Sequence, residues 1–508
     1  MSRSKFAFRV LIAAVVALFM SCSVMEVSAQ YNNNNSNNNS NNNSRNNNSN
    51  NNSNNNNGNS RGGRNGNNNS SNGNNNSNGG GGSGYGSGVV IQAGRLQVLT
   101  DATTLDQSRL EAAYNSVPSD LRTPSPMRKV SLTRLEKQII ANNGIVSDEM
   151  ANLAGLLRIE NVFFYPETGD IVLAGPAEGW TRLDDGSAIG YKSGQPTLQL
   201  ADLVVALRAF PQGGKGTELI GCSIDPTEEG LRNMQSYLNT AAKPDIADAY
   251  QLTNYAQGIR DSLGPQNVKV WGVSPKTNFA QTLVAADYRM KLIGIGLQEP
   301  PVKMTTYAEK SDPVSMAKNA LVRWFFEPDY DCAVTTENGD ALALNAKTVN
   351  LVGEDELVTT AGQRVSSKRG NRATKLYAKS FTDKYAAIAK EDPIYAALRN
   401  LIDMTITAAW IQREDLYTKA NWSMEFFGSE ESYPLESLDA VEFADTAVNI
   451  LHHGRTGSVA SFPTGGGVLI NAYKAFDADH IKYDDNGKLE ARRAELSKSI
   501  PDNVWWWD

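Results

Sequence analysis

Histidine and cysteine are scarce in this chain, with three of each among 508 residues. The histidines are His452, His453 and His480, and adjacent residues such as the first two cannot share one face of a strand. A zinc or iron site built on histidine would need two of them at helical spacing and a further ligand close by. Asp477, Asp479 and His480 could approach the other two histidines in the folded chain, but solvated loop residues are the alternative. We expect no metal site and no other cofactor.

The chain also lacks an excess of positive charge, and its formal net charge is −7. Without residues 1–29, whose side chains contribute +2, the charge is −9; residues 89–508 alone carry −12, because the tract between contributes +3. A nucleic-acid surface needs clustered basic side chains. No uncharged apolar run after the N-terminus reaches the length of about 18 residues that spans a bilayer. We therefore expect no nucleic-acid partner and no transmembrane segment in the mature chain.

The N-terminus has the three parts of a secretory signal. Arg3, Lys5 and Arg9 precede an apolar stretch at 10–20, and Val27-Ser28-Ala29 is a small-x-small cleavage site. We predict a signal peptide at 1–29 and an exported protein that is periplasmic or extracellular. The alternative is lipid attachment at Cys22, which would hold the protein at a surface.

Residues 30–88 are nearly all Asn, Ser and Gly. They have no apolar side chains whose burial could offset the entropy of ordering the chain, so we predict a disordered Asn-rich spacer. A flexible coil of this length reaches about 40 Å. A self-associating Asn-rich segment is the alternative.

The body after residue 88 has the patterns of an α+β fold. Residues 268–301 predict a βαβ unit: a strand, a helix beginning near Ser274-Pro275, and a short buried strand at 292–297. Because about 420 residues exceed what one core usually supports, we expect an α/β-containing lobe at 89–305 and an α+β lobe at 306–508.

Hairpins are predicted on both sides of residue 305, and two long apolar helices are predicted after it. Pro166 to Gly169 predicts a turn between strands at 161–165 and 170–174, and Asn338-Gly339 predicts a second hairpin. In the second lobe, apolar residues at helical spacing predict helices at 376–390 and 394–413, the latter well buried.

Loss of the signal would leave two cysteines, Cys222 and Cys332. In an oxidising compartment they could form a disulfide, and so long a loop would restrict the unfolded chain by about 4 to 5 kcal/mol in the chain-entropy model. The alternative is two separately buried thiols.

No complete catalytic constellation appears, so we assign no catalytic or cofactor-binding residue. Ser315 and Lys318 have the spacing of a serine nucleophile and its lysine, but the other motifs of that class are missing. Asp287 and Lys291 are four apart and could pair on a helix surface, worth about 0.3 to 0.5 kcal/mol. With Arg289 they could alternatively bind a ligand at the end of a βα unit.

Four segments carry a resemblance to a known family: ENVFFYPETGDIVLAGPAEGW, GCSIDPTEEGL, NFAQTLVAADYRMKLIGIGL and RWFFEPDYDCAV. With the signal and the Asn-rich tract, they resemble exported bacterial proteins, found mainly in planctomycetes and classed only as a domain of unknown function. The resemblance implies a bacterial envelope or extracellular location and brings no active site with it.

Three functions from different classes remain open. The leading hypothesis is a non-enzymatic protein that acts by binding or assembly with an unknown envelope or extracellular partner. The alternative is a carboxylate-dependent hydrolase of envelope or extracellular polymer, because paired carboxylates leave no sequence motif. A small-ligand carrier would need an enclosed pocket near the ends of the strands at Cys222 and Val273.

Overall fold

The computed structural model describes residues 89–508 except 93, 99–106, 184–185, 246–247, 312–319, 346, 359–363, 367–371, 453–457 and 462–464. The predicted signal peptide, the Asn-rich spacer, Cys22, His453 and the Ser315–Lys318 spacing lie outside the described residues. None of the helices in the described part is long and apolar enough to span a bilayer.

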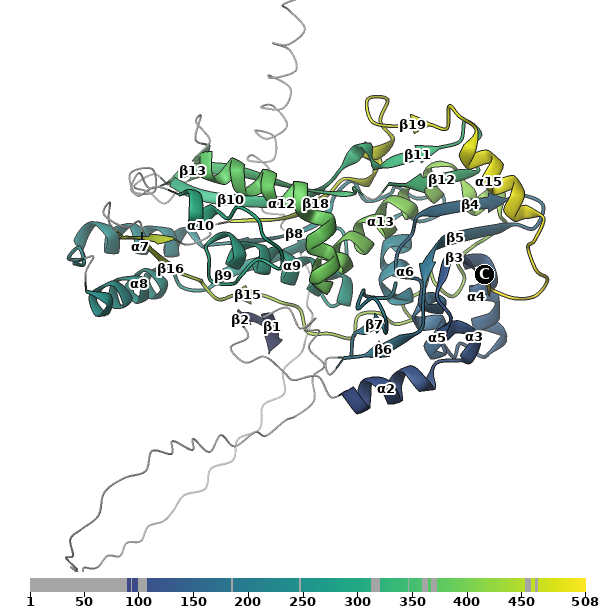
Figure 1. Ribbon diagram of the computed structural model, residues 1–508. Helices are drawn as coiled ribbons and strands as arrows, with labels where there is room; N and C mark the ends of the chain where they lie inside the picture. Colours follow the sequence, from purple (N-terminus) through teal and green to yellow (C-terminus); the bar gives the residue numbers. More distant parts are fainter. Residues whose placement is uncertain are drawn as a thin grey trace, which may run out of the picture. The chain divides into compact units, whose positions relative to one another are not determined.

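A mixed nine-stranded sheet forms one side of the body (Figure 1). Its strands, in spatial order, are β1 (Val89–Gln92), β2 (Arg95–Val98), β15 (Phe443–Ala444), β9 (Gln266–Trp271), β8 (Ile220–Asp225), β18 (Gly466–Ile470), β10 (Ala320–Pro328), β13 (Val349–Val358) and β14 (Arg364–Ser366). Neighbours are antiparallel except β10 with β18 and β2 with β15.

A seven-stranded sheet forms the other side. Its order is β19 (Lys482–Tyr483), β11 (Ala333–Thr335), β12 (Ala341–Leu344), β4 (Asn161–Tyr165), β5 (Asp170–Ala177), β3 (Ser125–Ser131) and β20 (Trp506–Trp507). Both hairpins predicted from turn residues are confirmed, as β4–β5 and β11–β12. Two small hairpins are separate: β6 (Trp180–Arg182) with β7 (Ala188–Gly190), and β16 (Asn449–His452) with β17 (Ser458–Ser461).

Helices cover the sheets and fill the space between them. The longer ones are α2 (Gln107–Ser116), α4 (Leu132–Ala141), α6 (Leu200–Ala209), α7 (Glu228–Thr240), α8 (Ala249–Leu263), α9 (Asn278–Gly294), α12 (Arg372–Glu391), α13 (Pro393–Arg413) and α15 (Lys488–Ser497). The short ones are α3 (Ser119–Arg122), α5 (Asp148–Ala151), α10 (Tyr307–Lys310), α14 (Leu416–Lys419) and the 3-10 turns η1 (Leu153–Gly155), η2 (Tyr330–Cys332) and η4 (Ala472–Phe476). The α+β class is therefore confirmed.

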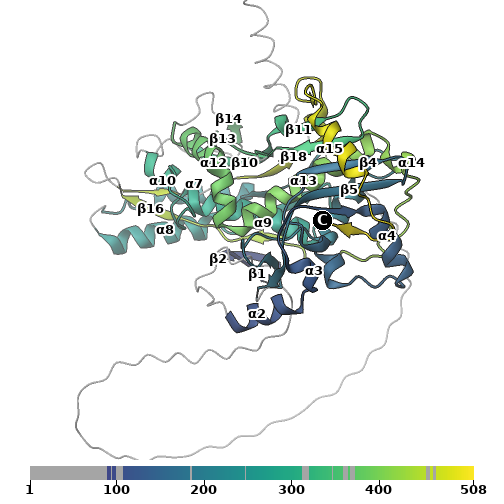
Figure 2. The same cartoon turned by 45° about the vertical axis from the view of Figure 1, so that its right-hand side comes forward.

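The predicted buried helix is α13, which lies between the two large sheets in both ribbon views (Figures 1 and 2). Asp392 caps it by accepting a hydrogen bond from the Ile394 amide, and Pro393 occupies its first turn. The helix contacts α6, α9 and α12 as well as β12. Strands from both sides of residue 305 share each large sheet. A domain boundary near residue 305 stays a prediction.

The expected βαβ unit is wrong in its second strand. The run that was predicted to form a strand at 292–297 instead forms the last turn of α9 and the residues after it. Leu292, Ile293 and Ile295 are fully buried there, and Tyr377 donates a hydrogen bond to the Met290 carbonyl near the helix end. A short, wholly apolar run fits a buried helix end as well as a buried strand, so its pattern alone does not decide between them.

Candidate functional site

A cavity of about 220 Å³ lies where α6, α9 and α13 meet the chain segment 186–199. The segment contributes the end of the β6–β7 hairpin and the residues leading into α6. A side-chain Cβ added at Gly186 would meet no atom within 4 Å, so the rim is open on that side. The cavity is thus built by parts of the chain more than 200 residues apart.

Asp202 is the acidic residue in this wall. It lies in the first turn of α6 and is only 5% exposed. Asn278, the first residue of α9, donates from Nδ2 to Asp202 Oδ2 at 2.9 Å and to Oδ1 at 3.2 Å. Burial raises the pKa of Asp202 to about 7, and the hydrogen bond from Asn278 opposes this only in part. Near neutral pH the carboxyl can therefore exist both with and without its proton.

Three hydrogen-bonded side chains position the segment before α6. Gln199 Nε2 donates to Asn152 Oδ1 at 2.9 Å and to Thr197 Oγ1 at 2.8 Å. Thr197 Oγ1 itself donates to Asn152 Oδ1 at 2.9 Å. These hydrogen bonds hold residues 197–199 in place in the cavity wall. None of them involves Asp202.

Asn400 of α13 is different, because only half of its amide has a partner. Its Nδ2 donates to the Leu157 carbonyl at 3.0 Å, whereas its Oδ1 has no hydrogen-bond partner although the side chain is 3% exposed. A buried acceptor without a partner costs about 1 to 3 kcal/mol. The oxygen atom is itself buried, so it is not open to a molecule in the cavity.

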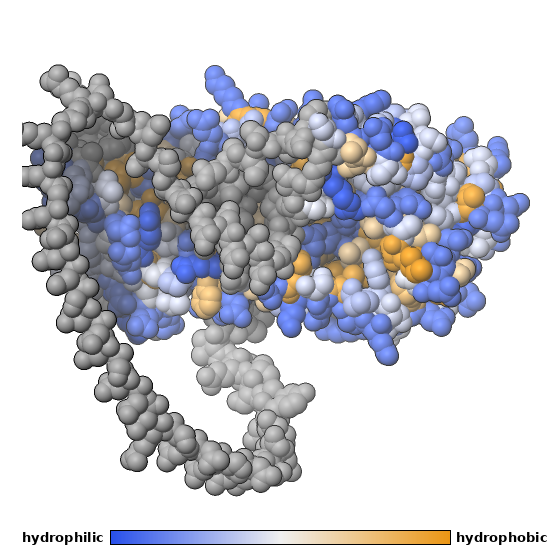
Figure 3. Space-filling view, turned by 90° about the horizontal axis from the view of Figure 1, so that it is seen from below, coloured by the Kyte–Doolittle hydropathy of each residue, from blue (hydrophilic) through white to orange (hydrophobic). Residues whose placement is uncertain are grey.

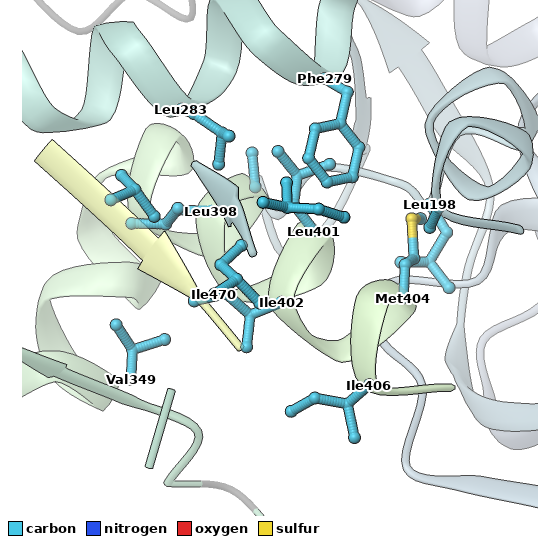
Figure 4. Packing of buried hydrophobic residues seen from close by; sticks show 14 of the residues in the cluster. Leu198, Phe279, Leu283, Val349, Leu398, Leu401, Ile402, Met404, Ile406 and Ile470 are labelled. Atoms are coloured by element: carbon cyan, nitrogen blue, oxygen red, sulfur yellow. The ribbon is translucent and has the colours of Figure 1, made fainter. Parts of the chain in front are cut away.

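Apolar side chains form the rest of the wall. Leu198 precedes α6, and Leu401 and Met404 follow one another along α13. Figure 4 shows Leu198 beside Met404, and Leu401 beside Phe279 of α9. The cavity therefore combines an apolar surface with a few polar groups, as small-molecule sites usually do.

The pairing of Asp287 and Lys291 is present, but its predicted place on the helix surface is wrong. Both side chains are buried, at 0% and 1% exposure, and Lys291 Nζ lies 2.7 Å from Asp287 Oδ2. This face of α9 packs against β8, where Lys291 Nζ also donates to the Ile224 carbonyl at 3.4 Å. Burial raises the pKa of Asp287 to about 6, and Lys291 opposes the rise.

Arg289 does not join this pair. Its Nε lies 2.6 Å from Asp392 Oδ2, at the start of α13. Asp287 and Lys291 thus pair with each other while Arg289 pairs with Asp392, so the three charged residues do not form the common ligand site considered from the sequence.

Both cysteines of the body are free, buried thiols in the structure. Cys222 lies in β8 and Cys332 in η2. Burial raises the pKa of Cys222 well above its ordinary value and that of Cys332 to about 12. Both thiols are therefore protonated at neutral pH, which makes them poor nucleophiles and poor metal ligands.

His480 pairs with Asp331 through Nδ1 at 3.1 Å. Among the residues that the structure describes, no group of three or more His, Cys, Asp or Glu side chains could hold a metal ion. Residues 484–487 form a turn, and Asp484 accepts hydrogen bonds from the amides of Lys488, Leu489 and Glu490 at the start of α15.

The sequence analysis did not select Asp202, Asn278 or Asn400. A signal was present for two of them: Asp202 is the acidic residue within the apolar stretch 200–207, and Asn400 interrupts the apolar pattern of α13. A polar residue on the buried side of an apolar helix needs a partner or a function. Asn278 follows a helix cap, so its sequence position gave no such signal.

Comparison with known proteins finds one family model, described as Protein of unknown function (DUF1598), over residues 222–307. The match runs from β8 to the first residue of α10 and includes Asn278, Asp287 and Lys291. Asp202 and Asn400 lie outside it. The chain thus contains a domain of unknown function. No curated protein and no solved structure shows significant similarity to the chain.

Proposed function

We propose that this protein is an exported binding protein of the envelope or extracellular space, and that its body holds a small ligand in the Asp202 cavity. The observation that carries the proposal is the combination, in one cavity, of a buried carboxyl group with an apolar wall from α13. The signal and spacer predicted at 1–88 support the location. They would present the folded body at a distance from a surface or partner.

The size of the cavity limits the ligand. At about 220 Å³ it exceeds an engineered protein cavity of about 150 Å³ that accepts benzene, but it is smaller than the 300 to 1,000 Å³ typical of drug-sized ligands. A polymer could place only one end group or side group there. We therefore propose a ligand, or a ligand group, of roughly the size of one substituted ring.

The described wall supports binding over the alternative of a hydrolase. Glycoside hydrolysis by two carboxyl groups needs them about 5 to 9.5 Å apart around the scissile bond. Among the described residues that line the cavity, Asp202 is the single carboxyl group. Its raised pKa suits proton transfer, but a second carboxylate to act as nucleophile or base is lacking in that lining.

The test is native mass spectrometry of the full chain after incubation with the small-molecule fraction of a whole-cell extract. Ala397 of α13 lines the cavity, so Ala397→Leu should fill it; Ala491→Leu is the matched control on the exposed face of α15. We expect a retained small molecule on the wild type and on the control, and its loss from Ala397→Leu. The absence of any retained molecule, or equal retention by all three chains, would contradict the proposal.

A further inference from the structure

The described cavity wall carries negative charge and no positive charge. Asp202 lines the cavity, whereas no lysine or arginine is among the described residues that line it. The Asn278 side chain, whose amide is neutral, donates hydrogen bonds to the carboxylate. Among the described lining residues, an ionised Asp202 thus has a neutral donor and no cation as its partner.

Burial without a cation is unfavourable for such a carboxylate, and this is the reason for its raised pKa. A cation bound beside the carboxylate would stabilise its ionised form and lower its pKa. The described lining thus offers a carboxylate and no positively charged side chain, which favours a molecule that carries a cation and donates hydrogen bonds over one that accepts them.

The apolar part of the wall favours a ligand that also has a hydrocarbon part. The side chains of Leu198, Leu401 and Met404 are 2% exposed or less and consist only of carbon and sulfur atoms. A bare metal ion would gain nothing from them, and a single carboxylate is too few ligands for calcium. A positively charged nitrogen on a small apolar body matches both parts of the wall.

We propose that the ligand of this cavity is a small primary amine in its ammonium form, with the nitrogen bound by the Asp202 carboxylate and the hydrocarbon part packed on Leu198, Leu401 and Met404. This inference rests on the proposed function, since it names the ligand class of the same site. Binding the cation requires the ionised carboxylate, so the protonated fraction of Asp202 releases its proton when the amine binds.

The pH dependence follows from this exchange. Burial and the Asn278 amide govern Asp202 itself, and Tyr433 is the titratable group whose pKa Asp202 raises in turn. Burial is the first cause of that rise, which takes the pKa of Tyr433 to about 12, so Tyr433 stays neutral over the relevant range. With a pKa of about 7 for Asp202, amine affinity should fall about a hundredfold between pH 8 and pH 5.

The experiment is calorimetric titration of the full chain with three probes of one shape: benzylamine, benzyl alcohol and benzoate. We expect benzylamine to bind at least about tenfold more tightly than benzyl alcohol at pH 8, which corresponds to one charge-assisted hydrogen bond, and benzoate not to bind. Benzylamine should lose its affinity as the pH falls, and benzyl alcohol should keep its own. This pH comparison needs no variant.

Asp202→Asn removes the negative charge and keeps the cavity, so it tests the two contributions separately. The variant should lose the preference for benzylamine and its pH dependence but still bind benzyl alcohol; Asp261→Asn, the same change on the exposed face of α8, should behave as the wild type. Equal affinity for benzylamine and benzyl alcohol, or tighter binding of benzoate, would overturn the amine and leave the proposed function standing. If no probe binds but native mass spectrometry finds a cavity-dependent ligand, the amine is again wrong; failure of both experiments overturns the proposed function as well.

Discussion

Asp287 and Lys291 face each other across one turn of α9, with Oδ2 and Nζ 2.7 Å apart and neither side chain more than 1% exposed. The pair lies inside the segment that matches the family of unknown function. One oxygen of the carboxylate, Oδ1, has no hydrogen-bond partner. Burying two charges costs desolvation free energy that their attraction need not repay, so the pair is not by itself a source of stability.

Removing one partner of this pair should lower the free energy of unfolding far more than replacing both partners. Asp287→Asn leaves the Lys291 ammonium buried without its counter-ion, and we expect a loss of about 3 to 5 kcal/mol in the free energy of unfolding. The double variant Asp287→Leu with Lys291→Met should recover most of that loss, because it buries apolar groups of similar volume. Chemical denaturation of both variants measures the difference. A double variant less stable than the single one would show that the pair stabilises the fold.

Asp202 should make the protein less stable as the pH rises. Its folded pKa of about 7 lies above the value of about 3.9 for an unfolded aspartate, so the folded state holds the proton more tightly. The resulting stabilisation is complete below about pH 4 and is lost as the pH rises through 7. Relative to Asp202→Asn, the wild type should lose about 4 kcal/mol between pH 4 and pH 8, at about 1.36 kcal/mol per pKa unit.

Denaturation of the wild type and of Asp202→Asn over this pH range gives the difference directly, since contributions of the other groups cancel. A difference that does not change with pH would mean that Asp202 titrates at its ordinary pKa. The same pair of proteins also serves the amine titration.

Asp170 should show the opposite dependence. Burial raises its pKa, but hydrogen bonds from Arg134 and Ser131 outweigh burial and hold the pKa below its ordinary value. Arg134 donates from Nε to Asp170 Oδ1 at 2.7 Å and from Nη2 to Oδ2 at 2.6 Å. Asp170→Asn should cost about 3 kcal/mol at pH 7, because it leaves the guanidinium without its carboxylate.

The stabilisation by Asp170 is present above the unfolded pKa of about 3.9 and is lost as the pH falls through the lower folded value. The difference between wild type and Asp170→Asn should therefore shrink in acid. Asp383→Asn, which breaks the exposed pair with Lys379, is the control and should leave the free energy of unfolding nearly unchanged at every pH.

Both thiols of the body should resist modification until the chain unfolds. In a chain that carries Cys22→Ser, a chromogenic thiol reagent should react with no cysteine in the native protein and with both Cys222 and Cys332 in denaturant, because burial keeps them protonated and inaccessible. A reducing agent should leave the melting temperature unchanged. Absence of reactive thiols in denaturant would instead reveal the disulfide considered from the sequence.

The mass of the exported protein should correspond to a chain that begins at Gln30. Small residues at Val27-Ser28-Ala29 predict cleavage there, and Ala29→Trp should block processing because bulky residues do not fit a small-x-small site. A mass increased by acyl chains, with Cys22 as the first residue, would establish the lipoprotein alternative. A cytoplasmic, unprocessed chain would contradict export.

Exposed apolar side chains are dispersed over the described surface. The large ones are Ile140, Ile145, Tyr250, Leu297, Phe443, Tyr483 and Val504. On the face seen from below, hydrophilic residues predominate and hydrophobic ones occur in small groups (Figure 3). Dispersed apolar residues are normal for a protein surface and assign no protein interface.

Local chemistry determined those parts of the fold that depend on neighbours in sequence. Asn338-Gly339 and Pro166 to Gly169 each specify a turn, and both hairpins formed as predicted. The C-terminal strand β20 pairs with β3, far from it in sequence. In contrast, the apolar residues 292–297 suit a helix or a strand, and only their packing against Trp324 and Tyr377 selected the helix.

By itself, the sequence determined the α+β class, the turns, the buried helix α13 and the lack of a recognisable catalytic motif, because each depends on residue type and spacing along the chain. Only the tertiary structure decided which residues form the cavity. Asp202, Asn278 and Asn400 come from three helices, and the raised pKa of Asp202 results from burial that exists only after those helices pack. Likewise, Asp287 and Lys291 have the spacing of a surface pair, and it is the packing of α9 on β8 that places them in the core.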